Sequence, residues 1–400
     1  MEKRPLDGIR VIEIGQLLAG PFTGTILGYF GAEIIKIEHP KSGDPIRQWR
    51  ETKEGTSLWW SSLSRNKKCI TLDLSTHKGR DILKSLITKS DILIENFRPG
   101  TIEKWGMGPE VLKDFNPRLI LARVSGYGQN GPYATKPGFA SVCEAFGGFR
   151  YVNGFPGEIP VRPNLSIGDT LAGIHAALGI LLAYINREKE GDEKGIGQVV
   201  DIAIFEAMFN MLEAVVPEYD GLGVVREPSG STITGIAPTN TYKCRDKSLI
   251  VIGANTDSMF SRLAKIIGKP ELAENVKFAD NKSRVKNQEE LDTLIQSWVE
   301  TMNPDSALKM LDAENIAAGP IYSVEEMFKD PQYLARELFE TVSVDNNSLK
   351  IPAIVPRLSK TPGRTDFPGP SLGKFNEEIY KNLLGLDDHT FKTLESEGII

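Results

Sequence analysis

Asp169 is the residue of this sequence whose setting most suggests chemistry. It stands in the stretch "IGDT", at the start of a long run of small and apolar residues. Aspartate is favoured at the N-cap of a helix, where its side chain accepts hydrogen bonds from free backbone N–H groups. A carboxylate in a tight glycine turn, half removed from water, can instead be a nucleophile or a base. Spacing alone leaves both interpretations open: a cap on a helix that begins at Thr170, or a catalytic group.

A second group of candidate residues occurs in the stretch "DILIENFRPG". Asn96, Phe97 and Arg98 stand at the carboxyl end of an expected parallel strand, and ligands bind at that end of an open α/β sheet. A strand-to-helix turn capped by Asn96 would explain the asparagine and Gly100. It leaves the Phe97–Arg98 pair unexplained, so the stretch favours a ligand site.

The basic residues of "SRNKKCITLDL" and the histidines give weaker signals. Arg65, Lys67 and Lys68 fit either a solvated rim or a site for a ligand phosphate, and by themselves they favour the rim. His175 lies in an apolar helical pattern, where a hydrogen-bonded core histidine is expected rather than a base. The other histidines are scattered along the chain: His39, His77 and His389.

A dinucleotide site is another interpretation of the N-terminal region. Glycines follow the expected strand that ends at Gly15, and Glu38 closes the next strand about where a ribose-binding carboxylate is found. The glycines do not spell G-x-G-x-x-G, because Gln16, Leu17 and Leu18 stand where the pyrophosphate turn needs closely spaced glycines. The pattern therefore disfavours NAD.

The elements that would position these residues alternate along the first half of the chain. Short β-branched runs, such as 10–15 and 32–38, are separated by helical patterns, which is typical of a mostly parallel sheet covered by helices. Further strands are expected in "CITLDL", "DILIENF" and "RLILARVSG". The predicted fold class is α/β, with a Rossmann-like large domain over residues 1–215.

From about Ser248 the pattern changes. One strand is followed by three helical patterns, which indicates a smaller α+β domain over residues 225–325. The C-terminal region is rich in proline and glycine and has few periodic runs, so we expect it to lie over other structure rather than build a core. Two domains agree with a length of 400 residues.

Composition restricts the class of protein. The apolar fraction of 40% and the charged fraction of 25% are typical of a soluble globular protein, and a formal charge of −6 gives no footprint for nucleic acid or an acidic membrane. Cys69, Cys143 and Cys244 are far apart and lack metal-ligand spacing. The apolar helix expected near 171–184 contains His175, so we expect it to be buried against protein. We expect a cytoplasmic protein with neither a signal peptide nor a metal site.

Taken together, these motifs resemble a known family. The order and spacing of the class III CoA-transferases are found in six stretches: "DGIRVIEIGQLLAGPFTGTILGYFGAEIIKIEHPKSGDPIR", "SRNKKCITLDL", "ENFRPG", "GYGQNGPY", "IGDTLAG" and "GQVVDIAIFEAM". The resemblance runs from about Leu6 to the C-terminus. The family includes formyl-CoA transferase and is similar to α-methylacyl-CoA racemase.

The resemblance implies a fold and an assembly. A Rossmann-like large domain would be completed by the C-terminal segment 330–400, and a small domain would accompany it. Two chains would interlock as linked rings in an obligate homodimer, with sites that combine residues of both. Coenzyme A and acyl-CoA would be substrates, so no permanently bound cofactor is implied. No nucleic-acid or membrane partner is expected.

Asp169 matches the catalytic aspartate of this family. The resemblance implies that its carboxylate attacks an acyl-CoA thioester to give an aspartyl anhydride, and that CoA then adds to give an aspartyl-CoA thioester. The acceptor acid repeats the exchange in reverse. A dry pocket is implied, because water would destroy the anhydride.

The family's CoA-binding positions also have counterparts here. His39 and Lys104 stand where formyl-CoA transferase has arginines, and a lysine still holds a phosphate as a point charge. Leu18 replaces a glutamine that in formyl-CoA transferase touches both cofactor and acyl group, which disfavours formate and oxalate as the substrate pair. The implied CoA-binding residues are Leu18, Ala19, His39, Leu72, Asn96, Phe97, Thr101, Lys104, Trp105 and Lys136.

Phe139 discriminates between two activities of this superfamily. Racemases have a histidine in a "GHD" type motif, as one half of an acid–base pair with the aspartate. The corresponding stretch here is "KPGFASVCEAFGG", with Phe139, and phenylalanine cannot transfer a proton. CoA transfer is therefore predicted, and the alternatives are an acyl-CoA racemase or epimerase and a catalytically silent acyl-CoA-binding protein.

Three arginines are candidates for binding an acceptor carboxylate. Arg47 and Arg50 stand in "PIRQWRE", and Arg162 stands in "PVRPN". A surface salt bridge is the alternative for each. The stretch "PVRPNLSIGDTLAG" is similar to the branch of the family that handles succinyl-CoA and small dicarboxylates such as glutarate, malate or citramalate, so we expect a dicarboxylate acceptor.

Overall fold

The computed structural model describes residues 3–191 and 195–400, and the chain divides into two compact units. Unit 1 comprises Met1–Phe149, Pro163–Glu213 and Arg336–Ile400. Unit 2 comprises Arg150–Arg162 and Ala214–Ala335. Residues 150–162 of unit 2 lie inside the range 1–215 expected for the larger domain.

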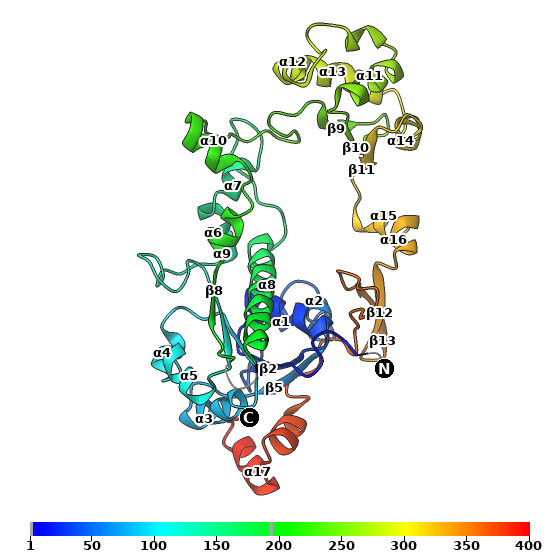
Figure 1. The fold of residues 1–400 in the computed structure, drawn as a ribbon. Helices are drawn as coiled ribbons and strands as arrows, with labels where there is room; N and C mark the ends of the chain where they lie inside the picture. The colour runs from blue at the N-terminus through cyan, green and yellow to red at the C-terminus, as the bar shows by residue number, and fades with distance from the viewer. Residues whose placement is uncertain (1–2, 192–194) are drawn as a thin grey trace. The chain divides into compact units, whose positions relative to one another are not determined.

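Unit 1 is built on a six-stranded sheet in which all neighbouring strands are parallel (Figure 1). The strand order β5-β2-β1-β6-β7-β8 runs outward from β1 on one side and from β6 on the other. The predicted α/β class with a parallel sheet is confirmed. The strands are β1 (Arg10–Glu13), β2 (Glu33–Glu38), β5 (Lys67–Thr71), β6 (Ile92–Glu95), β7 (Ile120–Ser125) and β8 (Val199–Ala203).

Helices cover both faces of this sheet, because its strands carry apolar residues on both. Val11 of β1 belongs to the core on one face, and Ile12 belongs to the core on the other. The first face is covered by α1 (Ala19–Tyr29) and α8 (Ile167–Glu190); the second is covered by α3 (His77–Ile87), α5 (Pro109–Phe115) and α17 (Asp388–Ser396).

The C-terminal segment contributes to the core of unit 1. The side chains of Tyr380, Phe391 and Leu394 are buried in the same cluster as those of β1 and β2. The backbone N–H of Asp73 donates to the carbonyl of Ile399 at 2.7 Å. The expectation that this region builds no core is therefore wrong, because the last turns place apolar residues at helical spacing after the proline-rich stretch.

Shorter helices and two hairpins complete unit 1. Two antiparallel hairpins, β3–β4 and β12–β13, lie in unit 1. The remaining elements of unit 1 are η1 (Pro45–Gln48), β3 (Thr52–Lys53), β4 (Thr56–Ser57), α2 (Leu58–Leu63), α4 (Thr101–Lys104), α6 (Ala140–Phe146), α9 (Ile204–Phe209), β12 (Phe339–Val344), β13 (Asn347–Pro352) and the π-helical turn η3 (Glu378–Leu383); α7 (Phe149–Val152) leads into unit 2.

Unit 2 has a three-stranded antiparallel sheet of order β11-β10-β9 and a helical layer around its own core. Arg284 is buried there, and its guanidinium donates to the carbonyls of Phe278, Ala237 and Asn255. Its elements are α10 (Val215–Leu222), β9 (Thr239–Lys243), β10 (Leu249–Gly253), α11 (Asp257–Ile266), η2 (Pro270–Ala273), α12 (Asn281–Lys286), α13 (Gln288–Val299), α14 (Pro304–Ala313), β11 (Ala317–Pro320), α15 (Val324–Met327) and α16 (Pro331–Ala335).

Helix α8 is the one helix in the described part of the chain that is long and apolar enough to cross a membrane, by length and composition only. A single such helix is weak evidence, because a core helix of a soluble protein passes the same test. One face of α8 packs on the sheet through Ala176, Ala177 and Ile180. The opposite face remains exposed and apolar.

Candidate active site

The turn between β1 and α1 lies at the point where the strand order reverses, which is where open α/β sheets bind ligands. Asn96, after the neighbouring strand β6, holds this turn. Its Oδ1 accepts from the N–H of Gln16 at 2.8 Å, and its Nδ2 donates to the carbonyl of Gln16 at 2.8 Å. A Cβ at Gly15 would lie 2.8 Å from Asn96 Oδ1, so a glycine is needed there. Asn96 therefore braces the adjacent turn rather than capping its own.

The short helix α4 contains two of the predicted CoA-binding residues, Thr101 and Lys104, and two more, Phe97 and Trp105, flank it. Phe97 and Trp105 meet edge to face, with ring centroids 5.1 Å apart. Thr101 Oγ1 donates to the carbonyl of Arg98 at 2.7 Å. The Lys104 side chain is exposed. The structure thus gathers these residues at one end of the sheet.

An ion triad positions α4: two of its members, Glu95 and Arg123, are buried, and the third, Glu103 of α4, is exposed. Arg123 of β7 donates to Glu95 at 2.7 Å and to Glu103 at 2.7 Å. The other oxygen of Glu95 accepts from the N–H of Phe97 at 2.7 Å. The sequence held one signal for this triad: Glu95 and Arg123 are charged residues within two apolar strands. A buried charge needs a partner, so the two could have been expected to pair.

Asp169 lies in the first turn of α8 but is not its N-cap, so of its two interpretations the cap is wrong. The helix begins at Ile167, and the N–H of Thr170 donates to the carbonyl of Ser166 at 3.1 Å. Ser166 is the N-cap residue and makes no side-chain cap bond. Asp169 is half-buried in a turn whose dipole favours a negative charge.

Glu144 of α6 does the capping instead. Its buried carboxylate accepts from the N–H of Gly168 at 3.0 Å. A Cβ at Gly168 would lie 2.9 Å from Glu144 Cγ, so only glycine permits this approach. A carboxylate from another helix therefore anchors the turn that carries Asp169. Sequence reasoning missed Glu144, because 24 residues separate it from its partner.

Cys143 adjoins the same turn and is not a competing nucleophile. Burial, together with the charges of Asp169 and Glu144, raises the pKa of its thiol to about 11. A thiol with that pKa stays protonated at neutral pH, and the thiolate is the nucleophilic form. Asp169 is thus the better placed nucleophile of the two.

Close packing of α1 on α8 places the start of α1 beside Gly173. Gly173, one helical turn after Asp169, lies so near α1 that a Cβ there would be 3.0 Å from the carbonyl of Ala19. Thr23 Oγ1 is within hydrogen-bond distance of the carbonyls of Ala19 and Gly173, at 3.1 and 3.3 Å. Ala19 and the first turns of α8 are therefore neighbours.

An apolar cavity of about 650 Å³ opens beside this contact. Its lining includes Leu18 and Phe22 of the α1 region, Trp59 of α2, and Thr170 and Ile174 of α8. Thr170 is the residue that follows Asp169, but Asp169 itself does not line the cavity. The walls are apolar, and the cavity is open on one side.

Four other predicted residues lie on three different segments. His39 follows β2 and is exposed, and Leu72 follows β5 and is buried in the core. Leu72 can therefore reach a ligand only through its backbone. Lys136 is exposed, with Nζ 3.5 Å from the centroid of the Tyr133 ring, and Phe139 precedes α6 with 67% of its side chain exposed.

The three candidate arginines have different surroundings. Arg47 is buried, donates to both oxygens of Glu38 at 2.7 and 2.8 Å, and lies over the Trp60 ring. This geometry is that of a structural ion pair rather than a substrate contact. Because Glu38 is bound to Arg47, it is not free to bind the ribose of a dinucleotide. Arg50 is exposed above Trp59, and Arg162 is exposed in unit 2.

The basic residues of "SRNKK" do not form a solvated rim, so that expectation is wrong for two of them. Arg65 is buried, and it donates to the carbonyl of Ser62 at 2.9 Å. Lys67 is buried, with Nζ 2.9 and 3.1 Å from the oxygens of Glu13. Lys68 alone reaches solvent. An interior anion neutralises Lys67, which the local pattern does not reveal.

His175 is hydrogen-bonded, as expected, although it is only half-buried. Its Nδ1 lies 2.8 Å from the carbonyl of Leu171, and its Nε2 lies 3.3 Å from Nδ2 of Asn210.

Within residues 3–191 and 195–400, no group of three His, Cys, Asp or Glu residues could hold a metal ion.

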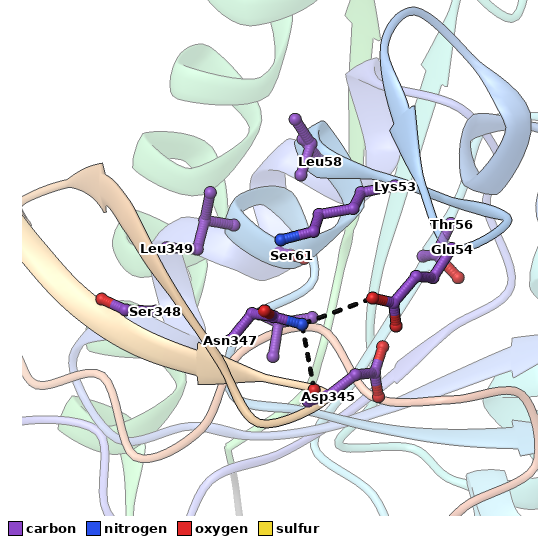
Figure 2. Close-up of a pocket in the computed structure, with 10 residues that line it drawn as sticks. Lys53, Glu54, Thr56, Leu58, Ser61, Asp345, Asn347, Ser348 and Leu349 are labelled. Atoms are coloured by element: carbon purple, nitrogen blue, oxygen red, sulfur yellow. Dashed lines mark hydrogen bonds between the residues drawn. The ribbon is translucent and has the colours of Figure 1, made fainter.

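A second pocket lies between the two hairpins of unit 1. Figure 2 shows the Lys53 side chain extending into it, and Asn347 Nδ2 lies 3.4 Å from Glu54 Oε1 across it. Its volume of about 30 Å³ is that of roughly one or two water molecules. The residues that line it are outside the set predicted for the site.

Comparison with known proteins finds similarity along nearly the whole chain. Residues 6–376 match the sequence model described as CoA-transferase family III. A succinyl-CoA–D-citramalate CoA-transferase of Chloroflexus aurantiacus is 47% identical over 99% of this chain and 98% of its own. The alpha subunit of a succinyl-CoA–L-malate CoA-transferase of the same species is 40% identical over 100% and 93%. The crystal structure of a CAIB/BAIF family protein from Brucella suis has a TM-score of 0.84 at 31% identity, covering 96% of this chain and 100% of that one.

Proposed function

This chain belongs to CoA-transferase family III, and we propose that it moves CoA from succinyl-CoA to a small dicarboxylic acid. The observation that carries the proposal is the similarity, over nearly the full length of both chains, to a succinyl-CoA–D-citramalate CoA-transferase. Relatives at lower identity are named for L-malate and for glutarate. These acceptors share two carboxylates on a short carbon chain.

The proposed mechanism uses Asp169 as a covalent nucleophile. Its carboxylate attacks the thioester carbon of the donor, the C–S bond breaks, and CoA leaves as a thiolate from an aspartyl anhydride. The thiolate then attacks the aspartyl carbonyl, which releases the donor acid and leaves an aspartyl-CoA thioester. The acceptor carboxylate attacks the aspartyl carbonyl of this thioester, the C–S bond breaks, and CoA thiolate leaves from a second anhydride. The thiolate then attacks the acceptor's acyl carbon, which gives the new acyl-CoA and restores the Asp169 carboxylate. No water or redox partner is consumed.

Several features support this role for Asp169. The α8 dipole favours its charged, nucleophilic form, and the cavity beside Thr170 is apolar. The N–H of Gly168 already donates to Glu144, so it does not stabilise the oxyanion that forms at the attacked carbonyl. Phe139 provides no proton relay for racemisation, so transfer remains the favoured reaction.

We also propose that a second copy of the chain covers α8. The exposed face of α8 carries Ile174, Leu178, Leu182 and Ile185, at 46% to 60% exposure. Such a stripe at helical spacing, on a helix whose other face is already packed, marks a protein contact. An interlocked homodimer of this family would bury it and would help to keep water from the anhydride.

The assembly is tested by sedimentation equilibrium. We expect a mass near twice the 44.1 kDa of one chain. Leu178→Asp is expected to weaken the dimer and reduce transfer, because it puts a charge into an apolar interface. Val276→Asp, which puts the same charge at an exposed apolar position of unit 2, is the matched control and should remain dimeric. A monomeric wild type that transfers CoA would contradict the proposal.

The substrate class is tested with succinyl-CoA and a panel of acceptors, with the acyl-CoA products identified by mass spectrometry. We expect transfer to D-citramalate, L-malate or glutarate. Arg50→Ala and Arg162→Ala are compared separately on glutarate and pentanoate, which differ by one carboxylate. Loss of the arginine that binds this second carboxylate should raise KM for glutarate about tenfold and leave KM for pentanoate unchanged. Failure of wild type to use any dicarboxylate would refute the proposed substrate class.

A further inference from the structure

Leu17 adopts a backbone conformation that leucine rarely takes. Its φ is +64°, in the left-handed region, where a residue with a Cβ is disfavoured. It stands in the β1–α1 turn immediately before Leu18 and Ala19, the first two predicted CoA-binding residues. The direction in which the backbone enters α1 therefore depends on Leu17 remaining in this conformation.

Asp44 holds Leu17 there. The N–H of Leu17 lies 3.1 and 3.2 Å from the two carboxylate oxygens of Asp44. The same carboxylate accepts from the N–H of Ile46 at 3.0 Å and pairs with Lys36 Nζ at 2.8 Å. Asp44 is 1% exposed, so water does not compete for these bonds.

The charge of Asp44 is retained at neutral pH. Burial by itself raises the pKa of this carboxyl, but the adjacent Lys36 ammonium and the N–H groups of Ile46 and Leu17 outweigh burial and hold the pKa below its ordinary value. A charge-assisted hydrogen bond to the Leu17 N–H is roughly twice as strong as a neutral one.

The rest of the turn is held by the same buried charges. Lys36 Nζ donates to the carbonyl of Gly15 at 3.0 Å, and Lys67 Nζ donates to the carbonyl of Pro21. Three backbone groups of the turn, at Gly15, Leu17 and Pro21, are thus bound by side chains from the β2 and β5 region. Of these, only the bond from Leu17 acts on a left-handed residue.

We propose that Asp44 is a positioning residue for acyl-CoA: it keeps Leu17 left-handed and so sets the backbone at Leu18 and Ala19 in the conformation that binds CoA. This inference rests on the proposed function for the role of the turn. The proposed role differs from a general contribution to stability. If glycine, which adopts positive φ freely, replaces Leu17, the protein should bind CoA equally well with or without the Asp44 carboxylate.

Calorimetric titration of the full chain with free CoA measures the effect. Asp44→Asn keeps one acceptor oxygen but loses the charge, and it should raise the Kd for CoA about tenfold, with kcat within about threefold of wild type. Leu17→Gly alone should bind like wild type, because glycine adopts positive φ freely. The double variant Asp44→Asn/Leu17→Gly should recover the wild-type Kd.

Leu17→Val leaves Asp44 untouched and provides a test if Asp44→Asn does not fold. A β-branched residue resists positive φ, so the Kd for CoA should rise. Lys247→Val is the matched control: Lys247 has φ +74° in unit 2, and its substitution should leave the Kd unchanged. The proposal is overturned if Leu17→Val binds CoA like wild type, or if Leu17→Gly does not rescue a folded Asp44→Asn. If the wild type binds CoA but transfers none, the proposed function is refuted. The Kd values of the Leu17 and Asp44 variants would still decide the role of Asp44.

Discussion

Asp169→Ala is expected to fold normally and to lose CoA transfer by at least about a thousandfold, because the variant has no carboxylate to form the anhydride. Alanine is an excellent helix residue, and Gly168 keeps its bond to Glu144, so the first turn of α8 should persist. The measurement is kcat with succinyl-CoA and an active dicarboxylate, alongside a thermal melt. Asp305→Ala, which removes an exposed acid from the first turn of α14, is the control and should retain full activity.

A chemical trap identifies the intermediate. Hydroxylamine attacks an aspartyl anhydride or an aspartyl-CoA thioester and leaves a hydroxamate on the aspartate. Wild type incubated with succinyl-CoA and hydroxylamine should therefore carry a hydroxamate at Asp169, located by mass spectrometry of its peptides. Asp169→Asn should carry none. If the alanine variant kept its activity within about tenfold of wild type, the covalent mechanism through this residue would be excluded.

Lys67→Met is expected to lower the free energy of unfolding by about 3–5 kcal/mol, the typical cost of removing one partner of a buried ion pair. Glu13 and Lys67 are both 0% exposed, and Lys67 Nζ contacts both oxygens of Glu13. Lys36 also contacts Glu13, at 3.1 Å, but is shared with Asp44. The variant therefore leaves a buried carboxylate undercompensated. Urea denaturation followed by tryptophan fluorescence measures the loss.

Lys68→Met is the matched control, one residue further along the same strand and on its opposite face. Lys68 pairs with Glu33 and Glu378 at 2.6 Å each, but 26% of its side chain is exposed. Its loss should cost at most about 1 kcal/mol. The double variant Glu13→Gln/Lys67→Met should recover part of the stability, because no unpaired carboxylate then remains. Equal losses from Lys67→Met and Lys68→Met would contradict this account.

Much of the fold could be predicted from local pattern. The β-branched runs at 10–15 and 32–38 became neighbouring strands of a parallel sheet, because segments buried on both faces are recognisable from their apolar residues alone. The motif set identified the family, which the comparisons confirm. The roles assigned to individual residues, including Asp169 and the CoA-binding set, stay predictions until the variants are measured.

The errors have one physical origin. Lys67 and Arg65 were expected at the surface, and a helix cap was one of the two interpretations of Asp169. An alternating pattern indicates on which face of a strand a side chain lies, but not whether that face is covered or carries an opposite charge. In the same way, an acid near a helix start is a cap only if no other acceptor has taken the amide, and Glu144 had done so.

The sequence by itself determined the family, the parallel sheet and the presence of Asp169 between a glycine and an apolar helix. These depend on residues close together in the chain. The tertiary structure decided which groups brace that residue and the CoA turn. The bonds from Gly168 to Glu144, from Leu17 to Asp44 and from Lys67 to Glu13 span 24, 27 and 54 residues. Hydrogen bonds and ion pairs act over about 3 Å, so only the folded chain, which brings these partners together, could reveal them.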